Sequence, residues 1–138
     1  MAAKKAPVAI DTIGVGKVFD KKVAEDGAEA IGKALGKVIG GSGKLALERK
    51  VPKGEKGFDV SGTIKELTFD DGVLAGKLSL QVNLMPERKM FAMLEGGGKV
   101  DGVKPAKVGE AMADLAAAMA ESAGGKARKA MEAKAGDL

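Results

Sequence analysis

Hydrophobic and polar residues alternate with a period of two through the middle of the chain. In residues 58–69 apolar side chains occupy every second position, and the parity shifts near Lys65 and Glu66. In residues 74–84, Leu and Val take one parity while Lys, Ser, Gln and Asn take the other. This alternation is typical of strands with one buried face, and the shift is typical of a β-bulge. Joined at Asp70-Asp71-Gly72, the two runs predict a β-hairpin.

Three shorter segments, residues 7–13, 44–50 and 90–94, are predicted to be further strands because apolar residues again alternate with polar or small ones. The first strand leads into Gly14-Val15-Gly16, which we expect to be flexible, and the last is expected to fray into a glycine loop at residues 96–98. With the hairpin, these segments give five strands.

Two segments, residues 21–39 and 105–122, place apolar or small residues three and four positions apart, as an amphipathic helix does. Asp20 is predicted to cap the first helix, and the glycine-rich residues 40–43 are predicted to end it. Residues 123–138 are rich in Ala and Lys and contain few large apolar side chains. We expect this segment to be a mobile or weakly helical tail.

The order of elements, β-α-β-β-β-β-α, predicts an α+β fold with one mixed sheet of about five strands and two helices packed on one face. The helix between the first two strands predicts a parallel pair joined by a right-handed crossover, and the later strands form an antiparallel meander. We expect one domain over residues 1–122, followed by the tail over residues 123–138.

The composition removes several classes of chemistry. The chain has 138 residues, with no Cys, no His, no Trp and no Tyr, and its only aromatic residues are four Phe. Disulfides, zinc sites with His or Cys ligands, and Ser-His or Cys-His catalytic arrangements are therefore excluded. The remaining residues show no recognisable catalytic or metal-binding pattern. The sequence predicts no catalytic residues, no metal and no cofactor, so we expect the protein not to be an enzyme.

The charge distribution offers one candidate binding patch. The formal net charge is +4, and four basic residues crowd a predicted loop between strands, where Glu48 and Glu55 offset part of their charge. Such a cluster can bind an anion or an acidic partner, and the alternative is an ordinary solvated loop. The candidate binding residues are Arg49, Lys50, Lys53 and Lys56.

Two other patterns have ordinary structural explanations. The glycine-rich residues 36–44 lack the spacing and the Ser or Thr of a phosphate-binding loop, and they follow a helix instead of opening one. Methionines can line a surface that accepts varied apolar ligands, but we expect them mainly to fill the core. The methionines concerned are Met85, Met90, Met93, Met112 and Met119.

The strand sequences FDVSGTIKEL (residues 58–67) and GKLSLQVNL (residues 76–84), after an opening PVAI strand, a long helix and a GKLALER segment, resemble a group of bacterial envelope domains. These are the penicillin-binding-protein activator lipoproteins, the curli-secretion lipoprotein and the amino-terminal domain of the Tol translocation protein. The resemblance implies a non-catalytic domain that docks onto a larger envelope protein or assembly. This chain departs from these families in having no Cys for lipidation.

These observations leave three hypotheses of function. The first is a non-enzymatic binding or accessory module of the bacterial cell envelope, whose partner is a larger envelope protein or assembly. The second is a structural subunit that self-assembles into a homo-oligomer. The third is a small basic nucleic-acid-binding protein, which is disfavoured because no segment has the Arg, Asn and Gln pattern of a recognition element. The sequence has no transmembrane run, and its location is expected to be periplasmic or secreted if a leader has been removed, and otherwise cytoplasmic.

Overall fold

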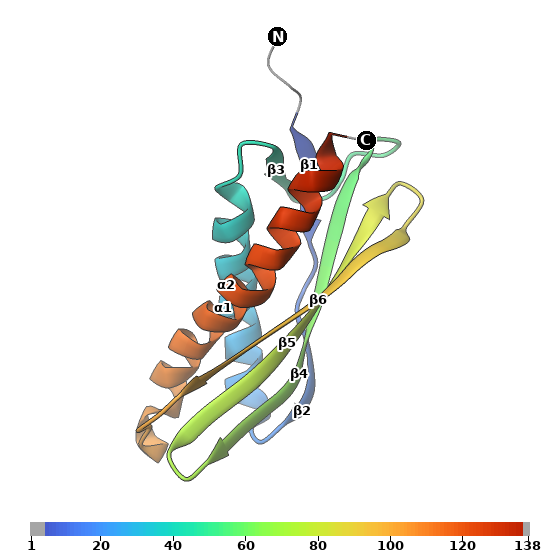
Figure 1. Cartoon of the computed structure of the whole chain (residues 1–138). Helices are drawn as coiled ribbons and strands as arrows, with labels where there is room; N and C mark the ends of the chain where they lie inside the picture. Colours follow the sequence, from blue (N-terminus) through green and yellow to red (C-terminus); the bar gives the residue numbers. More distant parts are fainter. Residues whose placement is uncertain (1–4, 137–138) are drawn as a thin grey trace.

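A mixed sheet of six strands carries two long helices on one of its faces (Figure 1). The structure, a computed structural model, describes residues 5–136. The strands are β1 (Ala6–Ile10), β2 (Gly14–Val18), β3 (Leu45–Glu48), β4 (Gly57–Asp70), β5 (Val73–Met85) and β6 (Lys89–Val100). The helices are α1 (Lys21–Gly40) and α2 (Val108–Ala135), and a short 3-10 turn (Pro105–Lys107) leads into α2. The predicted α+β class and the two helices are confirmed.

The strands follow the order β3-β1-β4-β5-β6 across the sheet. β1 pairs in parallel with β3 on one side and with residues 58–60 of β4 on the other. The parallel pair joined through α1 is therefore confirmed, as is the antiparallel meander of β4, β5 and β6. β2 lies beyond the end of β1 and pairs in parallel with residues 63–67 of the same long strand β4. β1 and β2 thus lie end to end along the same edge of β4, with a break between them.

The expectation that Gly14-Val15-Gly16 is flexible is wrong, because these residues belong to β2. A Cβ atom on Gly16 would lie 2.9 Å from the carbonyl oxygen of Ile64, so the absence of a side chain lets the two strands approach. Glycine has a low intrinsic propensity for strands, and the pairing with β4 outweighs this low propensity. The sheet therefore has one strand more than the sequence predicted.

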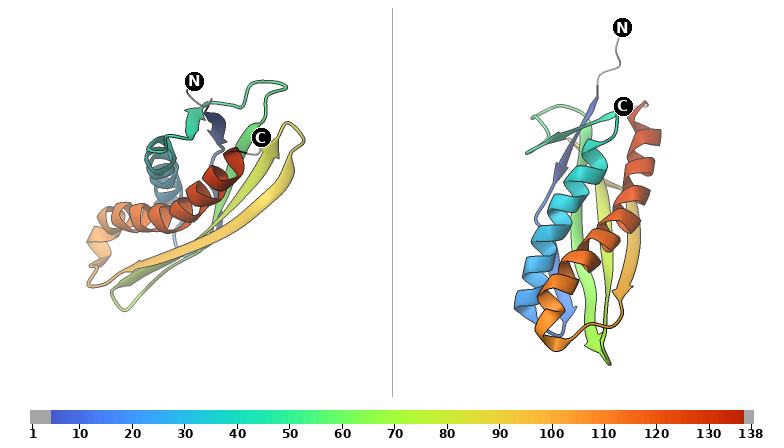
Figure 2. Two further views of the ribbon diagram at one scale, coloured as in Figure 1. Left: turned by 45° about the horizontal axis from the view of Figure 1, so that its top comes forward. Right: turned by 90° about the vertical axis from the view of Figure 1, so that its left-hand side faces the viewer.

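The prediction of a glycine loop at residues 96–98 is also wrong, since β6 continues through these residues to Val100. A Cβ atom on Gly96 would lie 2.5 Å from the backbone nitrogen of Ala123 in α2. This glycine is required because the backbone of the helix passes directly over the strand. Figure 2 shows α2 lying along the face of the sheet formed by the later strands.

The turn and the bulge of the central hairpin are confirmed. Asp71 and Gly72, between β4 and β5, have φ values of 50° and 74°. Two consecutive residues with positive φ are typical of the tight type I′ turn, and Asp and Gly accept this conformation readily. The register between β4 and β5 shifts between Ile64 and Glu66, where the parity changes in the sequence.

Helix α1 begins as predicted. The side chain of Asp20 caps it by accepting a hydrogen bond from the backbone nitrogen of Val23 at 3.1 Å. One face of the helix is buried against the sheet and α2. The buried residues are Ala24, Gly27, Ala28, Ile31, Leu35 and Ile39.

Residues 123–138 were predicted to be a mobile or weakly helical tail. Over the described residues the mobile alternative is wrong, because α2 continues without interruption to Ala135. Ala123, Ala127 and Met131 are fully buried in the core. These residues follow a helical spacing of four, and their mostly small side chains bring α2 close to α1. Residues 137–138 lie outside the described residues.

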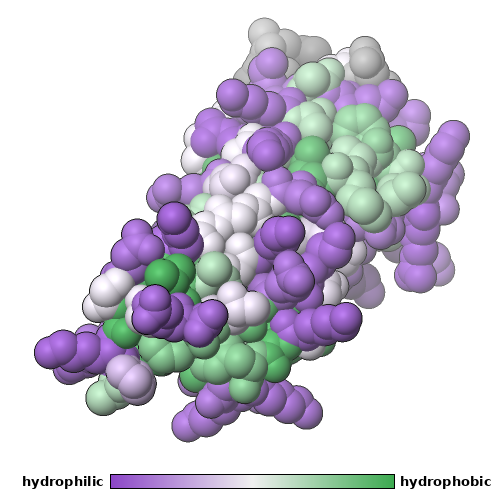
Figure 3. All heavy atoms as spheres, turned by 60° about the horizontal axis from the view of Figure 1, so that its bottom comes forward, coloured by the Kyte–Doolittle hydropathy of each residue, from purple (hydrophilic) through white to green (hydrophobic). Residues whose placement is uncertain are grey.

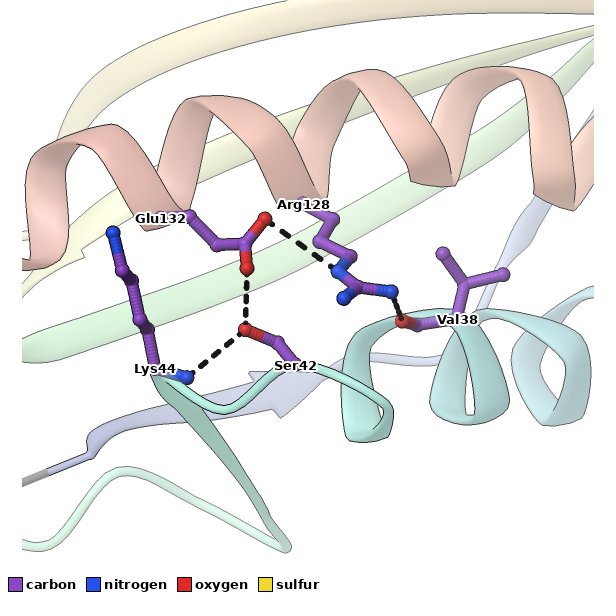
Figure 4. A network of polar contacts seen from close by, with 5 residues as sticks. All are labelled: Val38, Ser42, Lys44, Arg128 and Glu132. Atoms are coloured by element: carbon purple, nitrogen blue, oxygen red, sulfur yellow. Dashed lines mark hydrogen bonds and ion pairs between the residues drawn. The ribbon is translucent and has the colours of Figure 1, made fainter.

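A polar network joins the end of α1 to the last turns of α2 (Figure 4). The hydroxyl of Ser42 donates to the Oε2 atom of Glu132 at 2.7 Å and accepts from the backbone nitrogen of Lys44 at 3.1 Å. Arg128 forms an ion pair with Glu132 at 3.5 Å and donates to the carbonyl oxygen of Val38 at 3.2 Å. The network gives the α1 carbonyl end a cationic partner and fixes α2 there.

The methionines divide between the core and the surface. Met112 and Met119 are buried, as expected, and Met85 is partly buried. Met90 and Met93 are instead 56% and 58% exposed, so the expectation of core filling is wrong for these two. They pair with Asn83 and Gln81 on β5 and face away from the helices. We call this side of the sheet, opposite α1 and α2, the open face.

Candidate functional site

The predicted basic residues lie on the loop of residues 49–56, between β3 and β4. Val51 anchors this loop and is only 7% exposed. A Cβ atom on Gly57 would lie 3.2 Å from the Cγ1 atom of Val51, which places the loop against the beginning of β4. The four predicted binding residues are all exposed: Arg49, Lys50, Lys53 and Lys56.

The loop and the turn between β5 and β6 enclose a hollow of about 470 Å³ on the open face. Arg49 and Lys50 line it, and the turn adds Arg88, whose φ of 58° is rare for a residue with a side chain. Lys53 lines an adjoining hollow of about 290 Å³, whereas Lys56 lines neither. The structure therefore brings two of the four predicted residues together with a third basic side chain, and their role in binding stays a prediction.

Acidic and amide side chains share the first of these hollows, which we call the polar hollow. Asp59 lies on β4 between Ala9 of β1 and Asn83 of β5, and Asp11 follows the end of β1. Burial, a hydrogen bond with Asp11 and the negative charge of Asp11 raise the pKa of Asp59 from 3.8 to about 6, and the charge of Arg88 opposes this shift. The raised pKa means that the Asp59 carboxyl group stays protonated in mildly acidic solution.

A second cavity, with a volume of about 540 Å³, lies between α1 and the edge of the sheet. We call it the α1 groove. Its helix side presents Ala28, Gly32 and Gly36, which are spaced four residues apart and therefore lie one above another on the helix. The apolar residues on its sheet side are Ile10, Ile13, Val15 and Leu47. The groove is thus apolar, with little side-chain volume on the helix side.

The rim of the α1 groove is strongly acidic. Four carboxylates and a single basic residue line it, although the chain as a whole has a net charge of +4. Glu25 and Glu29 come from α1, where Glu29 also forms an exposed i,i+4 ion pair with Lys33 at 3.5 Å. The rim residues from the sheet side are Asp11, Glu48 and Arg49. The local charge therefore favours a cationic ligand or partner.

Large hydrophobic side chains are exposed at four described positions, and only one of them lies in the α1 groove. Leu47, at 46% exposure, lines the groove near the end of β3. The other three are Phe19, Met90 and Met93. On the face drawn in Figure 3, green hydrophobic areas lie among purple hydrophilic side chains. The α1 groove is distinguished by combining an exposed apolar side chain with a cavity and a predominantly negative charge.

Apart from Arg49, the residues of the α1 groove were not predicted from the sequence. Ala28, Gly32 and Gly36 form a small-residue stripe beside the hydrophobic face of the helix, and Glu25 and Glu29 accompany it. That stripe was the sequence signal from which the groove could have been predicted. Whether the stripe is exposed, however, depends on where β3 ends, and the sequence pattern does not show this. Arg88 and the Asp11–Asp59 pair were missed because their proximity depends on strand order.

Two further observations concern membranes and metals. Neither helix within residues 5–136 has the length and apolar character needed to cross a membrane. Among the same residues, no three acidic side chains are grouped closely enough to hold a metal ion.

Comparisons with known proteins place the fold among bacterial proteins. No protein-family model and no curated protein matches the chain. A Xanthomonas campestris protein of the DUF330 family is 8% identical, with a TM-score of 0.65, and the match covers 98% of this chain and 90% of that one. The minor lipoprotein of Acinetobacter baumannii is 8% identical, with a TM-score of 0.50 and 93% of both chains covered.

A third similar structure is that of PelC from Paraburkholderia phytofirmans, which is described as a dodecamer. It is 12% identical to this chain, with a TM-score of 0.51, and the match covers 83% of this chain and 86% of PelC. At these identities the likeness shows the fold alone. The predicted resemblance to bacterial lipoprotein domains is therefore confirmed at the level of fold, and the three families named from the sequence are not among these matches.

Proposed function

We propose that this protein is a non-enzymatic accessory module of the bacterial cell envelope, which docks onto a larger protein or assembly through the α1 groove. The observation that carries the proposal is the groove itself, which combines an apolar floor, an acidic rim and a volume of about 540 Å³. Protein interfaces typically have an apolar centre and a polar border of this kind. The fold shared with a bacterial lipoprotein supports the envelope as the location.

The composition supports a role without catalysis. The chain contains neither His nor Cys, the side chains that most often act as general base or reactive nucleophile near neutral pH. The carboxyl pair of the polar hollow, Asp11 and Asp59, is accompanied by Arg and Lys residues but by no hydroxyl side chain among its lining residues. Binding a partner by shape and charge requires neither a general base nor a reactive nucleophile.

Site-specific photo-cross-linking in cells that produce the protein tests the docking proposal. A photoreactive amino acid replaces Leu47 in the α1 groove, and the matched control replaces Ala117, which is exposed on α2 outside the groove. We expect one discrete adduct with an envelope protein from position 47, and its loss when Glu25→Lys and Glu29→Lys are introduced. The same adduct from position 117, or none from position 47, would contradict the proposal.

A self-assembling structural subunit is the second candidate function. The observation that favours it is the similarity in fold to PelC, which is described as a dodecamer. β6 also pairs only with β5 among the described strands, so its outer edge offers backbone groups for pairing between copies. Light scattering over a concentration series, at low and high salt, tests this candidate. A defined oligomer supports self-assembly, and a monomer at every concentration eliminates it.

A further inference from the structure

We infer that the α1 groove binds an extended, basic segment of a partner protein, which adds as a strand to the outer edge of β2. This inference rests on the proposed docking function and specifies the chemistry of the partner. Three features of the groove support it: an unpaired strand edge, space beside the small residues of α1, and an acidic rim.

The strand edge results from the short length of β3. β3 pairs with residues 6–9 of β1 and ends at Glu48, whereas the line of β1 and β2 continues to Val18. In the described chain β2 pairs only with β4, so the backbone groups on its other edge have no strand partner. A segment that continues the line of β3 would lie along β2. Five residues of β2 extend over roughly 17 Å, which suits a peptide of five to seven residues.

Space for the side chains of such a segment lies beneath α1. A Cβ atom placed on Gly32 would have no heavy atom within 4 Å, and one on Gly36 would meet only the Cδ2 atom of Leu47, at 3.4 Å. Apolar side chains of an added strand, which point toward the same face at every second residue, can enter this space. They would contact the apolar floor formed in part by Ile13 and Val15.

The charge of the rim selects a basic segment. Glu25 and Glu29 stand on the helix side of the groove, and Asp11 and Glu48 stand on the sheet side, so carboxylates flank it on both sides. Basic residues between the apolar residues of the partner would meet these carboxylates. A second copy of the chain, with a net charge of +4, is repelled at long range, so we assign the groove to a different protein.

The probe for this inference is a fluorescein-labelled peptide of sequence KVKVKVK with blocked ends, and its binding is measured by fluorescence anisotropy at low salt. One control peptide replaces the lysines with glutamates, and the other carries N-methyl groups on all its backbone nitrogens, which keeps the charge but removes the donors needed for strand pairing on either edge. We expect saturable binding of the first peptide only. We also expect slower amide hydrogen exchange at alternate residues of β2 when that peptide binds.

Matched protein variants locate the binding site. Glu25→Lys with Glu29→Lys reverses the rim, and Glu110→Lys with Asp114→Lys makes the same charge change with the same spacing on exposed residues of α2. Charge reversal at the rim should weaken binding roughly tenfold or more, since two attractive contacts become repulsive, and the α2 control should change it by less than about threefold.

A second pair of variants tests the space in the groove. Gly32→Leu fills the groove, and Gly125→Leu adds the same side chain to α2, where a Cβ atom also has no neighbour within 4 Å. Both proteins should melt at or above the wild-type Tm because each loses a glycine from a helix. Only Gly32→Leu should abolish peptide binding.

The outcomes separate this inference from the proposed function. Equal binding to all variants, equal binding of the N-methylated peptide, or no saturable binding at millimolar peptide would overturn strand addition. If the cross-linked adduct at position 47 persists in that case, docking through the groove stands with a different type of partner; if the adduct is also absent, both proposals fail. Homo-oligomer formation that the peptide reverses would assign the groove to a second copy and overturn the inference.

Discussion

Truncation of Met131 to alanine tests whether the last turns of α2 belong to the core. The side chain of Met131 is completely buried, although it lies within the segment that the composition predicts to be mobile. Removing a buried methionine side chain costs about 2–5 kcal/mol of unfolding free energy, the lower part of the range applying where the surroundings can relax. Near the end of a helix we expect a loss of roughly 3 kcal/mol and, for a chain of this size, a fall in Tm of about 10 °C.

The measurement is urea unfolding followed by far-ultraviolet circular dichroism, because the chain has no Trp or Tyr to report by fluorescence. Lys129→Ala, at an exposed position of the same helix, is the control and should change stability by less than about 0.5 kcal/mol. If Met131→Ala is as stable as this control, the end of α2 opens independently of the rest of the fold, and our assignment of it to the core is wrong.

Three further predictions concern other parts of the fold. Ser42→Ala removes the buried hydroxyl that joins α1 to Glu132 and should lower the unfolding free energy by roughly 1–3 kcal/mol in the same urea assay. Gly96→Ala places a Cβ atom against the backbone of α2 and should cost about 1–3 kcal/mol, measured as a lower Tm. Folding raises the pKa of Asp59 from 3.8 to about 6, so binding of a proton to Asp59 favours the folded state. This contribution to the unfolding free energy is complete below a pH of 3.8 and is lost as the pH rises to about 6. Asp59→Asn should therefore remove part of the decline in urea midpoint between about pH 4 and pH 6.5.

The elements that the sequence predicted well are those whose pattern repeats over many residues. β4 and β5 alternate over more than ten residues each, and α1 combines a helical period with a capping Asp20. The sequence pattern is sufficient in these segments because every residue in them favours the same secondary structure as its neighbours. The hairpin turn at Asp71 and the bulge near Glu66 were predictable for the same reason.

The elements that the sequence did not predict depend on contacts between distant segments. β2 is a strand because β4 extends beyond the end of β1, and no property of residues 14–18 alone indicates this. The end of α2 is ordered because small residues such as Ala123 and Ala127 meet the rest of the core, although neither has a large side chain to mark it as buried. Burial of alanine is decided by the partner surface, which composition does not reveal.

The same limit applies to the candidate binding surfaces. The basic loop could be located because its charges lie close together in the chain, and the structure added Arg88 from another turn. The α1 groove could not be located, because it exists only where β3 stops and leaves α1 uncovered beside β2. A surface formed by the end of one strand requires the register of the sheet, and single-sequence patterns leave that register open.

Small residues have opposite consequences on the two sides of this molecule. On the α2 side they close the structure: a Cβ atom on Gly96 would lie 2.5 Å from the backbone of Ala123, and one on Gly124 would lie 2.8 Å from the side chain of Leu35. On the outer side of α1 they leave space, since a Cβ atom on Gly32 would contact nothing. A glycine in a helix interior destabilises the helix by roughly 0.5–1 kcal/mol relative to alanine, and close packing compensates for this at Gly124 but not at Gly32 or at Gly125 of α2. Gly32 therefore destabilises α1 without a compensating contact within the chain, and a partner strand in the α1 groove would supply such contacts.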